Sequence, residues 1–379
     1  MTGAGGAPVE RPTGARAAEA HEVRTVDYHT AGEPFRIVVS GVPEIPGATV
    51  LDRRTAASAP EVDVVRRLLC HEPRGHADMY GCFPVPPDGP PARSPDEPPG
   101  ERRGGLTDAG PVEPPPGWTA ADLGVLFWHK DGYSTACGHG TIALGAYAVE
   151  YGLVAADPDG ETTVEIDVPS GRVRARVRCA GGRVEAVTFR NVPSYVIARN
   201  VPARGVAVDV AYGGAIYACV PAAAFGRSTA AGDLTELIAL GRQVKAALAD
   251  HPSARHPRDD RLSGIYGVIF YDDLGSDGDR HHQRNVTVFA DGEVDRSPCG
   301  SGTAARLALL ADGRPDPRAV TLRHEGVAGG VFLASVAGVT EEAGRPAIVP
   351  EIEGTAFRTG EHRFLLDPRD PLGPGFTLR

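Results

Sequence analysis

Two cysteines begin the same short phrase, and this repetition suggests a duplicated unit. The run Cys137-Gly138-His139-Gly140-Thr141 recurs as Cys299-Gly300-Ser301-Gly302-Thr303, 162 positions further along the chain. An apolar, helix-like run follows each phrase, so each cysteine is predicted to stand at a helix start beside free backbone N–H groups. Such groups bind carboxylates, and the positive end of a helix lowers the pKa of a thiol. Two such sites facing each other could move protons to and from one small molecule.

Proton transfer at a carbon next to a carboxylate needs this combination of groups. Stabilising the negative charge that develops on the carboxylate usually supplies the largest part of the rate gain. Suitable donors for that role are the N–H groups of Gly138, His139, Gly300 and Ser301. Inversion of a stereocentre further requires a base on one face and an acid on the other, and two thiols can exchange these roles. Cys137 and Cys299 are therefore the predicted catalytic pair.

The other four cysteines are predicted to be structural. A lone cysteine in an apolar setting usually behaves as a small buried hydrophobic residue. None of Cys70, Cys82, Cys179 and Cys219 begins a Cys-Gly-x-Gly-Thr phrase. The chain has no Cys-x-x-Cys pair and no zinc-ligand spacing, so free thiols are expected.

Composition limits the class of partner. The 379 residues are 41% apolar and carry a formal net charge of −10, without a Lys/Arg cluster. This argues against a nucleic-acid or anionic-membrane surface and favours a small-molecule substrate. No apolar run approaches the roughly 20 residues of a membrane span, and the first 22 residues lack a signal-peptide core, so a cytoplasmic location is expected.

The pattern of apolar residues predicts an α+β protein in which strands outnumber helices. Helices are expected after each Cys phrase, near Val62–Cys70, and over Leu234–Leu248, where His251-Pro252 ends the helix. Strands are expected over Glu22–Tyr28, Phe35–Gly41, Ala121–His129, Thr162–Val168, Val173–Cys179, Val184–Asn191, Val206–Ala211, Ile216–Val220, Tyr266–Tyr271, Asn285–Phe289, Ala319–Leu322, Gly330–Val336, Ala347–Ile352 and His362–Leu366.

The length favours two domains. Residues 1–20 are predicted to be a flexible tail, 21–197 a first domain and 198–366 a second one. A run rich in Pro, Gly and charged residues at 84–117 is predicted to be a loop inserted in the first domain. A C-terminal tail at 367–379 could pack back on the first domain.

Five longer motifs give the chain a resemblance to a known family. They are Asp27-Tyr28-His29-Thr30-Ala31-Gly32-Glu33-Pro34, Pro73-Arg74-Gly75-His76-Ala77-Asp78-Met79-Tyr80-Gly81, Gly132-Tyr133-Ser134-Thr135-Ala136-Cys137-Gly138-His139-Gly140, Ala211-Tyr212-Gly213-Gly214 and Asp295-Arg296-Ser297-Pro298-Cys299-Gly300-Ser301-Gly302-Thr303. With these motifs, residues 23–364 resemble the proline racemase family, which includes proline racemases, 4-hydroxyproline 2-epimerases and trans-3-hydroxyproline dehydratases.

The resemblance implies two pseudo-symmetric domains of the diaminopimelate epimerase type, each a curved sheet or barrel around a central helix. It places the active site in the cleft between the domains, and it implies no cofactor, no metal and a homodimer. Carried over by motif, Cys137 and Cys299 are the acid/base pair, Asp295 pairs with the ring nitrogen, and the substrate carboxylate contacts Gly138, His139, Gly300 and Ser301.

Some of these residues have a second interpretation. An imidazole at a helix start, such as His139, could contact substrate or only bond to its own loop. An aspartate in the position of Asp295 is in general often a cap or turn residue. The motif residues His29, Glu33, His76 and Asp78 lack metal spacing and are taken as structural. No Gly-x-Ser-x-Gly elbow in a strand-to-helix context supports a hydrolase.

Two reactions remain open within the resemblance, and one reading lies outside them. The dehydratase branch typically keeps one cysteine and has Thr or Ser in the other place, whereas this chain has both Cys137 and Cys299. The pair favours a racemase or epimerase of proline or hydroxyproline. The motifs around His76 and Cys137 resemble the dehydratase-like subgroup, so a trans-3-hydroxy-L-proline dehydratase is the alternative. A catalytically silent amino-acid-binding protein is the third.

Overall fold

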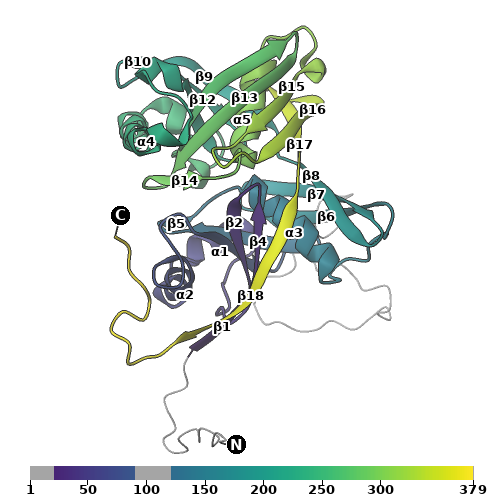
Figure 1. The fold of residues 1–379 in the computed structure, drawn as a ribbon, viewed down its shortest axis with the longest axis vertical. Helices are drawn as coiled ribbons and strands as arrows, with labels where there is room; N and C mark the ends of the chain where they lie inside the picture. Colours follow the sequence, from purple (N-terminus) through teal and green to yellow (C-terminus); the bar gives the residue numbers. More distant parts are fainter. Residues whose placement is uncertain (1–20, 90–120, 379) are drawn as a thin grey trace, which may run out of the picture.

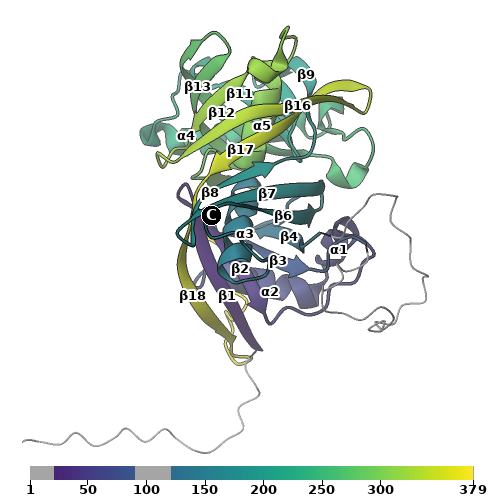
Figure 2. The same cartoon turned by 90° about the vertical axis from the view of Figure 1, so that its right-hand side faces the viewer.

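The computed structural model describes residues 21–89 and 121–378. The predicted flexible tail at 1–20 and most of the predicted insertion at 84–117 lie outside the described residues. The described chain forms two lobes, one above the other, and each lobe wraps a curved sheet around one helix (Figures 1 and 2). This is the two-lobed α+β architecture that the sequence predicted.

The first lobe is built from the N-terminal strands. In the order of their pairing, β1, β2, β3, β4, β6, β7 and β8 lie side by side, and the short β5 makes a hairpin with β4. These strands are β1 (His21–Thr30), β2 (Glu33–Ser40), β3 (Tyr80–Val85), β4 (Leu123–His129), β5 (Gly132–Tyr133), β6 (Glu161–Val168), β7 (Gly171–Ala180) and β8 (Arg183–Arg190).

The second lobe closes on itself. Going round the sheet, β9, β10, β11, β12, β13, β15, β16 and β17 pair in turn, and β17 returns to β9. A closed sheet has no free edge and a fully covered interior. These strands are β9 (Ser194–Ala203), β10 (Val206–Tyr212), β11 (Ile216–Pro221), β12 (Ile265–Asp277), β13 (Arg280–Phe289), β15 (Thr321–Glu325), β16 (Val331–Glu342) and β17 (Arg345–Gly354). The short β14 (Glu293–Asp295) pairs with β13.

The last strand crosses from one lobe to the other. β18 (Ala356–Leu366) follows β17 after one residue and pairs with β1 along its whole length, from Thr30 to His21 (Figure 1). Beyond it, Phe376 pairs with Glu72, and the Arg74 side chain donates to the Gly373 carbonyl. On these contacts we propose that the second domain ends near residue 354 and that residues 356–376 belong with the first, unlike the predicted boundary at 366.

One central helix fills each lobe. α3 (Gly138–Glu150) packs against strands of the first lobe, and α5 (Gly300–Ala311) packs inside the second. Nearly every residue of both helices is buried, as expected for helices that a sheet surrounds. The remaining helices are α1 (Val50–Ala56), α2 (Pro60–Cys70) and α4 (Leu234–Leu248), with short 3-10 turns at Ala222–Phe225, Ala231–Asp233, Pro252–Ala254, Asp260–Leu262 and Pro317–Ala319.

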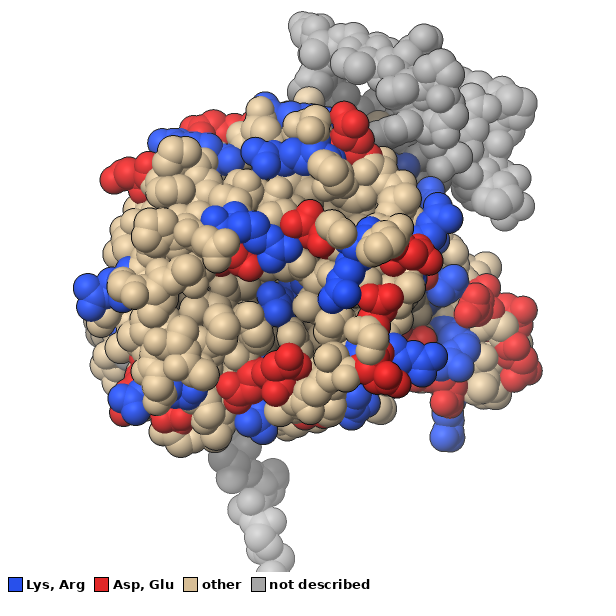
Figure 3. All heavy atoms as spheres, turned by 90° about the horizontal axis from the view of Figure 1, so that it is seen from above, with Lys and Arg blue, Asp and Glu red and all other residues tan. Residues whose placement is uncertain are grey.

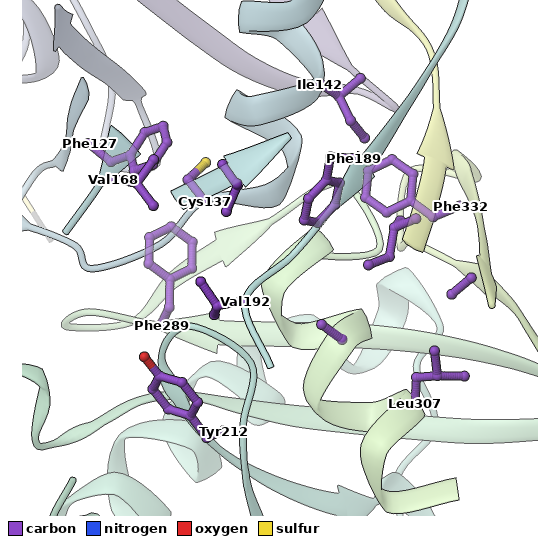
Figure 4. Close-up of a cluster of buried hydrophobic side chains, with 14 of the residues drawn as sticks. Phe127, Cys137, Ile142, Val168, Phe189, Val192, Tyr212, Phe289, Leu307 and Phe332 are labelled. Carbon is purple, nitrogen blue, oxygen red and sulfur yellow. The ribbon is translucent and has the colours of Figure 1, made fainter. Parts of the chain in front are cut away.

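Buried apolar side chains of both lobes form one continuous cluster. Figure 4 shows Cys137 of the first lobe and Phe289 of the second among its members.

Figure 3 shows one face of the surface, on which basic and acidic side chains are interspersed. Within the described residues, no helix is both long enough and apolar enough to cross a bilayer. All six cysteines are buried free thiols.

Candidate active site

The two repeated phrases meet where the lobes touch. Cys137 is the N-cap of α3, and Cys299 is the N-cap of α5. The first turns of the two helices approach so closely that a methyl group on Gly138 would lie 2.5 Å from the Gly300 Cα. The reverse holds as well, since a methyl group on Gly300 would lie 2.6 Å from the Gly138 Cα. Only glycine at both positions permits this contact, which brings the starts of the two helices, with their free N–H groups, side by side.

All seven residues that the sequence singled out line a single cavity at this junction. Cys137, Gly138 and His139 come from the first lobe, while Asp295, Cys299, Gly300 and Ser301 come from the second. The remaining lining residues are Tyr80, Ala136, Tyr217, Tyr266 and Phe289. The two thiols, which are 162 positions apart in sequence, therefore face the same enclosed space.

The thiol of Cys137 is held by its own helix. Its Sγ accepts a hydrogen bond from the Gly140 N–H at 3.2 Å, as the side chain of an N-cap residue does. The His139 ring lies beside it, with Nε2 3.4 Å from the sulfur. The His139 Nδ1 is 3.7 Å from an Asp295 carboxylate oxygen, so the imidazole bridges the two lobes.

The thiol of Cys299 is held differently. The backbone of Cys299 has φ +60°, a left-handed conformation that is uncommon for a residue with a side chain. Its Sγ makes no side-chain capping bond to α5 and instead lies 3.6 Å from the Tyr217 hydroxyl. Its backbone N–H donates to the Ser297 Oγ at 3.0 Å. Strained residues of this kind are often found at functional sites.

Burial controls the ionisation of both thiols. Cys137 is 6% exposed and Cys299 is 5% exposed, and this desolvation raises the pKa of each sulfur above its usual range. For Cys137, the Gly140 N–H opposes burial and lowers the pKa. For Cys299, the nearby Asp295 carboxylate raises the pKa further, and the Tyr217 hydroxyl lowers it. Each sulfur therefore has a neighbour that favours its thiolate.

Asp295 presents one carboxylate oxygen to the cavity. Its Oδ1 accepts from the Ser297 N–H at 2.8 Å and from the Ser297 Oγ at 2.7 Å. The other oxygen, Oδ2, is the one that lies near His139. A buried carboxylate with an oxygen turned toward a cavity is suited to hold a cation such as an ammonium group. Asp295 therefore holds the turn at Ser297 through Oδ1 and also lines the cavity.

Two acidic residues from the first lobe hold the segment that carries Asp295. Glu33 is fully buried, and its Oε2 accepts from the Arg296 N–H at 2.7 Å. Asp78 accepts from the Val294 N–H at 3.1 Å and pairs with the Arg296 guanidinium at 2.9 Å. Burial, and then the nearby Asp295 carboxylate, raise the pKa of Glu33 above its usual range. Through these contacts both residues join the first lobe to the segment that carries Asp295.

The sequence analysis did not identify most of the aromatic side chains that line the cavity, which are Tyr80, Tyr217, Tyr266 and Phe289. The hydroxyl of Tyr80 bonds to Ser134 and lies 3.2 Å from the Tyr266 hydroxyl, while Tyr217 bonds to Ser301 at 2.7 Å. Tyr80 stands inside one of the recognised motifs, which could have pointed to it. Tyr217 stands on a strand with no local signal, and only its place in the folded sheet brings it to the cavity.

One group of side chains beside the cavity has the composition of a metal site. Ligand atoms of His129, Asp131 and Glu293 lie within 4.8 Å of one another. The Lys130 ammonium already contacts both Asp131 oxygens, at 3.0 and 2.9 Å. Burial, followed by the nearby Asp131 charge, raises the pKa of Glu293, which favours a neutral carboxyl group there. A lysine thus already supplies positive charge at this cluster, and we assign it no metal.

The cavity is closed. Its volume is about 10 Å³, which is about enough for one water molecule. A molecule the size of an amino acid does not fit this volume, so we expect the lobes to move apart for binding and to close again, which would remove water from the reacting groups. Water exclusion strengthens the hydrogen bonds that the helix N–H groups make to a bound anion.

Comparison with known proteins identifies the family to which the chain belongs. The family described as "Proline racemase" matches residues 25–94 and 100–377. The chain belongs to the proline racemase family. The match includes both Cys phrases and all seven residues singled out above.

Several members of the proline racemase family are similar along nearly the whole chain. A trans-3-hydroxy-L-proline dehydratase of Bacillus cereus is 40% identical, over 93% of this chain and 97% of its own length. A 3-hydroxyproline 2-epimerase of Burkholderia multivorans is 41% identical, over 94% of this chain and 98% of its own. The solved structure of a hydroxyproline epimerase from Agrobacterium vitis, with bound trans-4-hydroxy-L-proline, has a TM-score of 0.78 at 30% identity, over 94% and 96% of the two chains.

Proposed function

We propose that this protein is a cofactor-independent racemase or epimerase that inverts the α-carbon of free proline or a hydroxyproline. The observation that carries the proposal is the placement of Cys137 and Cys299, from opposite lobes, in one closed cavity. Relatives with an epimerase name and an epimerase structure with a bound hydroxyproline support a substrate of this class.

The proposed reaction moves one proton in and one proton out. One cysteine, as a thiolate, takes the α-proton, so that the C–H bond breaks and an S–H bond forms. The electron pair moves into the carboxylate, and N–H groups at the starts of α3 and α5 stabilise the resulting enediolate. The other cysteine then gives its proton to the opposite face of the carbon, and its S–H bond breaks. The enzyme is left with the two protonation states exchanged, ready for the other enantiomer.

The carboxylate and the ring nitrogen of the substrate are assigned to the other residues that line the cavity. We assign the carboxylate to Gly138, His139, Gly300 and Ser301. Asp295 is assigned to the ring nitrogen, because its Oδ2 faces the cavity, where an ammonium group would neutralise its charge. Burying the ammonium without such a partner would be unfavourable by several kcal/mol, of the order given for unpaired buried charges.

The test is a panel of substrates followed by polarimetry and imine detection. L-proline, trans-4-hydroxy-L-proline and trans-3-hydroxy-L-proline are incubated with the enzyme. The proposal expects optical inversion of at least one of them, with no imine formed from that substrate. Loss of water without any inversion would instead identify a dehydratase, and no change in any substrate would leave only a binding protein.

A dehydratase is the second candidate, because relatives with that name are as similar as the named epimerase. Dehydration needs one base and an acid for the leaving hydroxyl, so it does not require a second thiol. In that case, Cys299→Thr is expected to retain imine formation from trans-3-hydroxy-L-proline. An epimerase with the same substitution loses inversion and forms no imine, so this one variant separates the two candidates.

The rate is expected to depend on pH as a bell-shaped curve. One thiol must be ionised and the other protonated, so kcat/KM rises with pH as the first thiol ionises and falls as the second one does. Because burial raises the pKa of both sulfurs, the optimum is expected on the alkaline side of neutrality. A rate measured from pH 6 to 11 that stays level throughout would contradict a reaction between paired thiols.

Two further expectations complete the proposal. A homodimer is expected, since two-fold assemblies are the commonest oligomers. A cytoplasmic location is expected from the composition and the free thiols.

A further inference from the structure

Each thiol has a backbone N–H group and a tyrosine hydroxyl that lower its pKa, but their order differs: the Gly140 N–H comes first for Cys137, and the Tyr217 hydroxyl comes first for Cys299. The Gly140 N–H that contacts Cys137 can only donate a hydrogen bond, so it favours the thiolate in every state of the reaction. The side chain of Cys299 makes no capping bond to α5, and the Gly302 N–H lowers its pKa less than the Tyr217 hydroxyl does. The Tyr217 hydroxyl, 3.6 Å from the Cys299 sulfur, can donate or accept a hydrogen bond, whereas an N–H group can only donate.

Tyr217 is held in place on three sides. It lies on β11, where it pairs with Ala211 of β10 and with Gly267 of β12, so its backbone is fixed by neighbouring strands. Its side chain is fully buried and makes an edge-to-face contact with Tyr266. Its hydroxyl lies 3.6 Å from the Cys299 sulfur and 2.7 Å from the Ser301 Oγ, which makes a chain of three polar atoms.

We propose that Tyr217 is a positioning residue for Cys299, and that its hydroxyl reverses its hydrogen bonds as this sulfur changes between thiol and thiolate. The proposal rests on the proposed function, because only a two-thiol reaction requires Cys299 to be stable in both states. No proton leaves the tyrosine in this arrangement, since its hydrogen only turns from one neighbour to the other.

The hydrogen-bond inventory of the chain fits both states. When Cys299 is a thiolate, the Tyr217 O–H donates to sulfur, and the Ser301 O–H donates to the phenolic oxygen. When Cys299 is a thiol, its S–H donates to the phenolic oxygen, and the Tyr217 O–H donates to the Ser301 Oγ. Each state keeps both bonds, so neither leaves an unsatisfied buried polar group. Burial also raises the pKa of Tyr217, which keeps the phenol protonated during turnover.

The test measures the ionisation of each thiol in the Tyr217→Phe variant. Protein without substrate is treated briefly with iodoacetamide over a range of pH, and the labelled fraction of Cys137 and Cys299 is read separately by peptide mass spectrometry. The variant is expected to raise the midpoint of Cys299 labelling by about one pH unit, because the donor to its thiolate is lost. The midpoint of Cys137 is expected to stay where it is in the wild type.

Tyr195→Phe is the matched control. Tyr195 is a buried tyrosine of the same lobe, it does not line the cavity, and its hydroxyl has no hydrogen-bond partner among the described residues. Its loss is expected to move neither midpoint. A general loosening of the lobe would move the labelling of both cysteines in both variants, and a shift confined to Cys299 in Tyr217→Phe separates positioning from this structural effect.

A second variant keeps the proposal open to contradiction if Tyr217→Phe does not fold. Ser301→Ala removes the group that donates to Tyr217 when Cys299 is ionised, and it is expected to raise the Cys299 midpoint by a smaller amount. A folded Tyr217→Phe protein with an unchanged Cys299 midpoint would overturn the proposal. Since labelling needs no substrate, this outcome is distinct from a failure of the proposed reaction, which would appear as a lack of inversion by the wild type.

Discussion

Replacing either Cys137 or Cys299 by serine is expected to abolish inversion, with kcat/KM reduced by at least about 10³-fold in both directions, which is within the range of general acid–base catalysis. A serine hydroxyl is far less acidic than a thiol, so it does not ionise to provide the base. Either substitution therefore removes a proton donor or acceptor from one face of the α-carbon. The loss must be equal in the two directions, since each cysteine is the base for one enantiomer and the acid for the other. The measurement is the initial rate of change in optical rotation, starting from each enantiomer.

Two controls accompany these variants. Cys179→Ser changes a cysteine of the first lobe that lies outside the cavity, and it is expected to retain activity. Mixing the Cys137→Ser and Cys299→Ser proteins is expected to restore nothing, because both thiols of one cavity belong to the same chain. Recovery of activity in the mixture would contradict a site built within one chain.

The second large effect is expected at the glycines where the helices meet. Gly138→Ala or Gly300→Ala places a methyl group within 2.6 Å of backbone atoms of the opposite lobe, closer than any real contact. Backbone cannot move aside as a flexible side chain does, so the lobes must separate and the thiols lose their alignment. We expect kcat/KM to fall by about 100-fold, the loss associated with misplacement by about 1 Å.

The alanine variants keep every N–H group, which makes them informative. If carboxylate binding by these N–H groups were the only role of Gly138 and Gly300, activity would survive the change. Gly232→Ala is the matched control, since a methyl group there meets no atom within 4 Å. Thermal unfolding of each variant verifies that it folds. Near-normal activity of folded Gly138→Ala or Gly300→Ala protein would contradict the closed arrangement of the lobes.

The candidate site was predictable because its signals are local. A cysteine, a run of small residues and then an apolar stretch define a helix start, and with it the free N–H groups, wherever the helix lies in the fold. The helix at Leu234–Leu248 was found with the observed limits for a similar reason, since its apolar spacing is regular and Pro252 blocks its continuation. Local patterns do not reveal that the starts of the two helices, at Gly138 and Gly300, are in contact.

The strands that the sequence analysis missed or made too short depend on contacts between distant residues or lie on the exposed surface. The strand Ser194–Ala203 was not predicted, although it closes the second barrel through its pairing with β17. The hairpin of β12 and β13 was predicted too short, because its outer half is charged and exposed and lacks the alternation of a half-buried strand. The place of β18 beside β1 follows from a pairing across more than 300 residues, which has no local signature.

The most direct measurement for the two-thiol reaction is the position of deuterium when inversion runs in deuterated water. At low conversion, the product enantiomer is expected to carry deuterium at the α-carbon, while the remaining substrate keeps its hydrogen. This asymmetry arises because the cysteine that removes the proton is not the one that returns it. Product that retains the original hydrogen, or substrate that exchanges before it inverts, would show that one group serves both faces and would contradict the account.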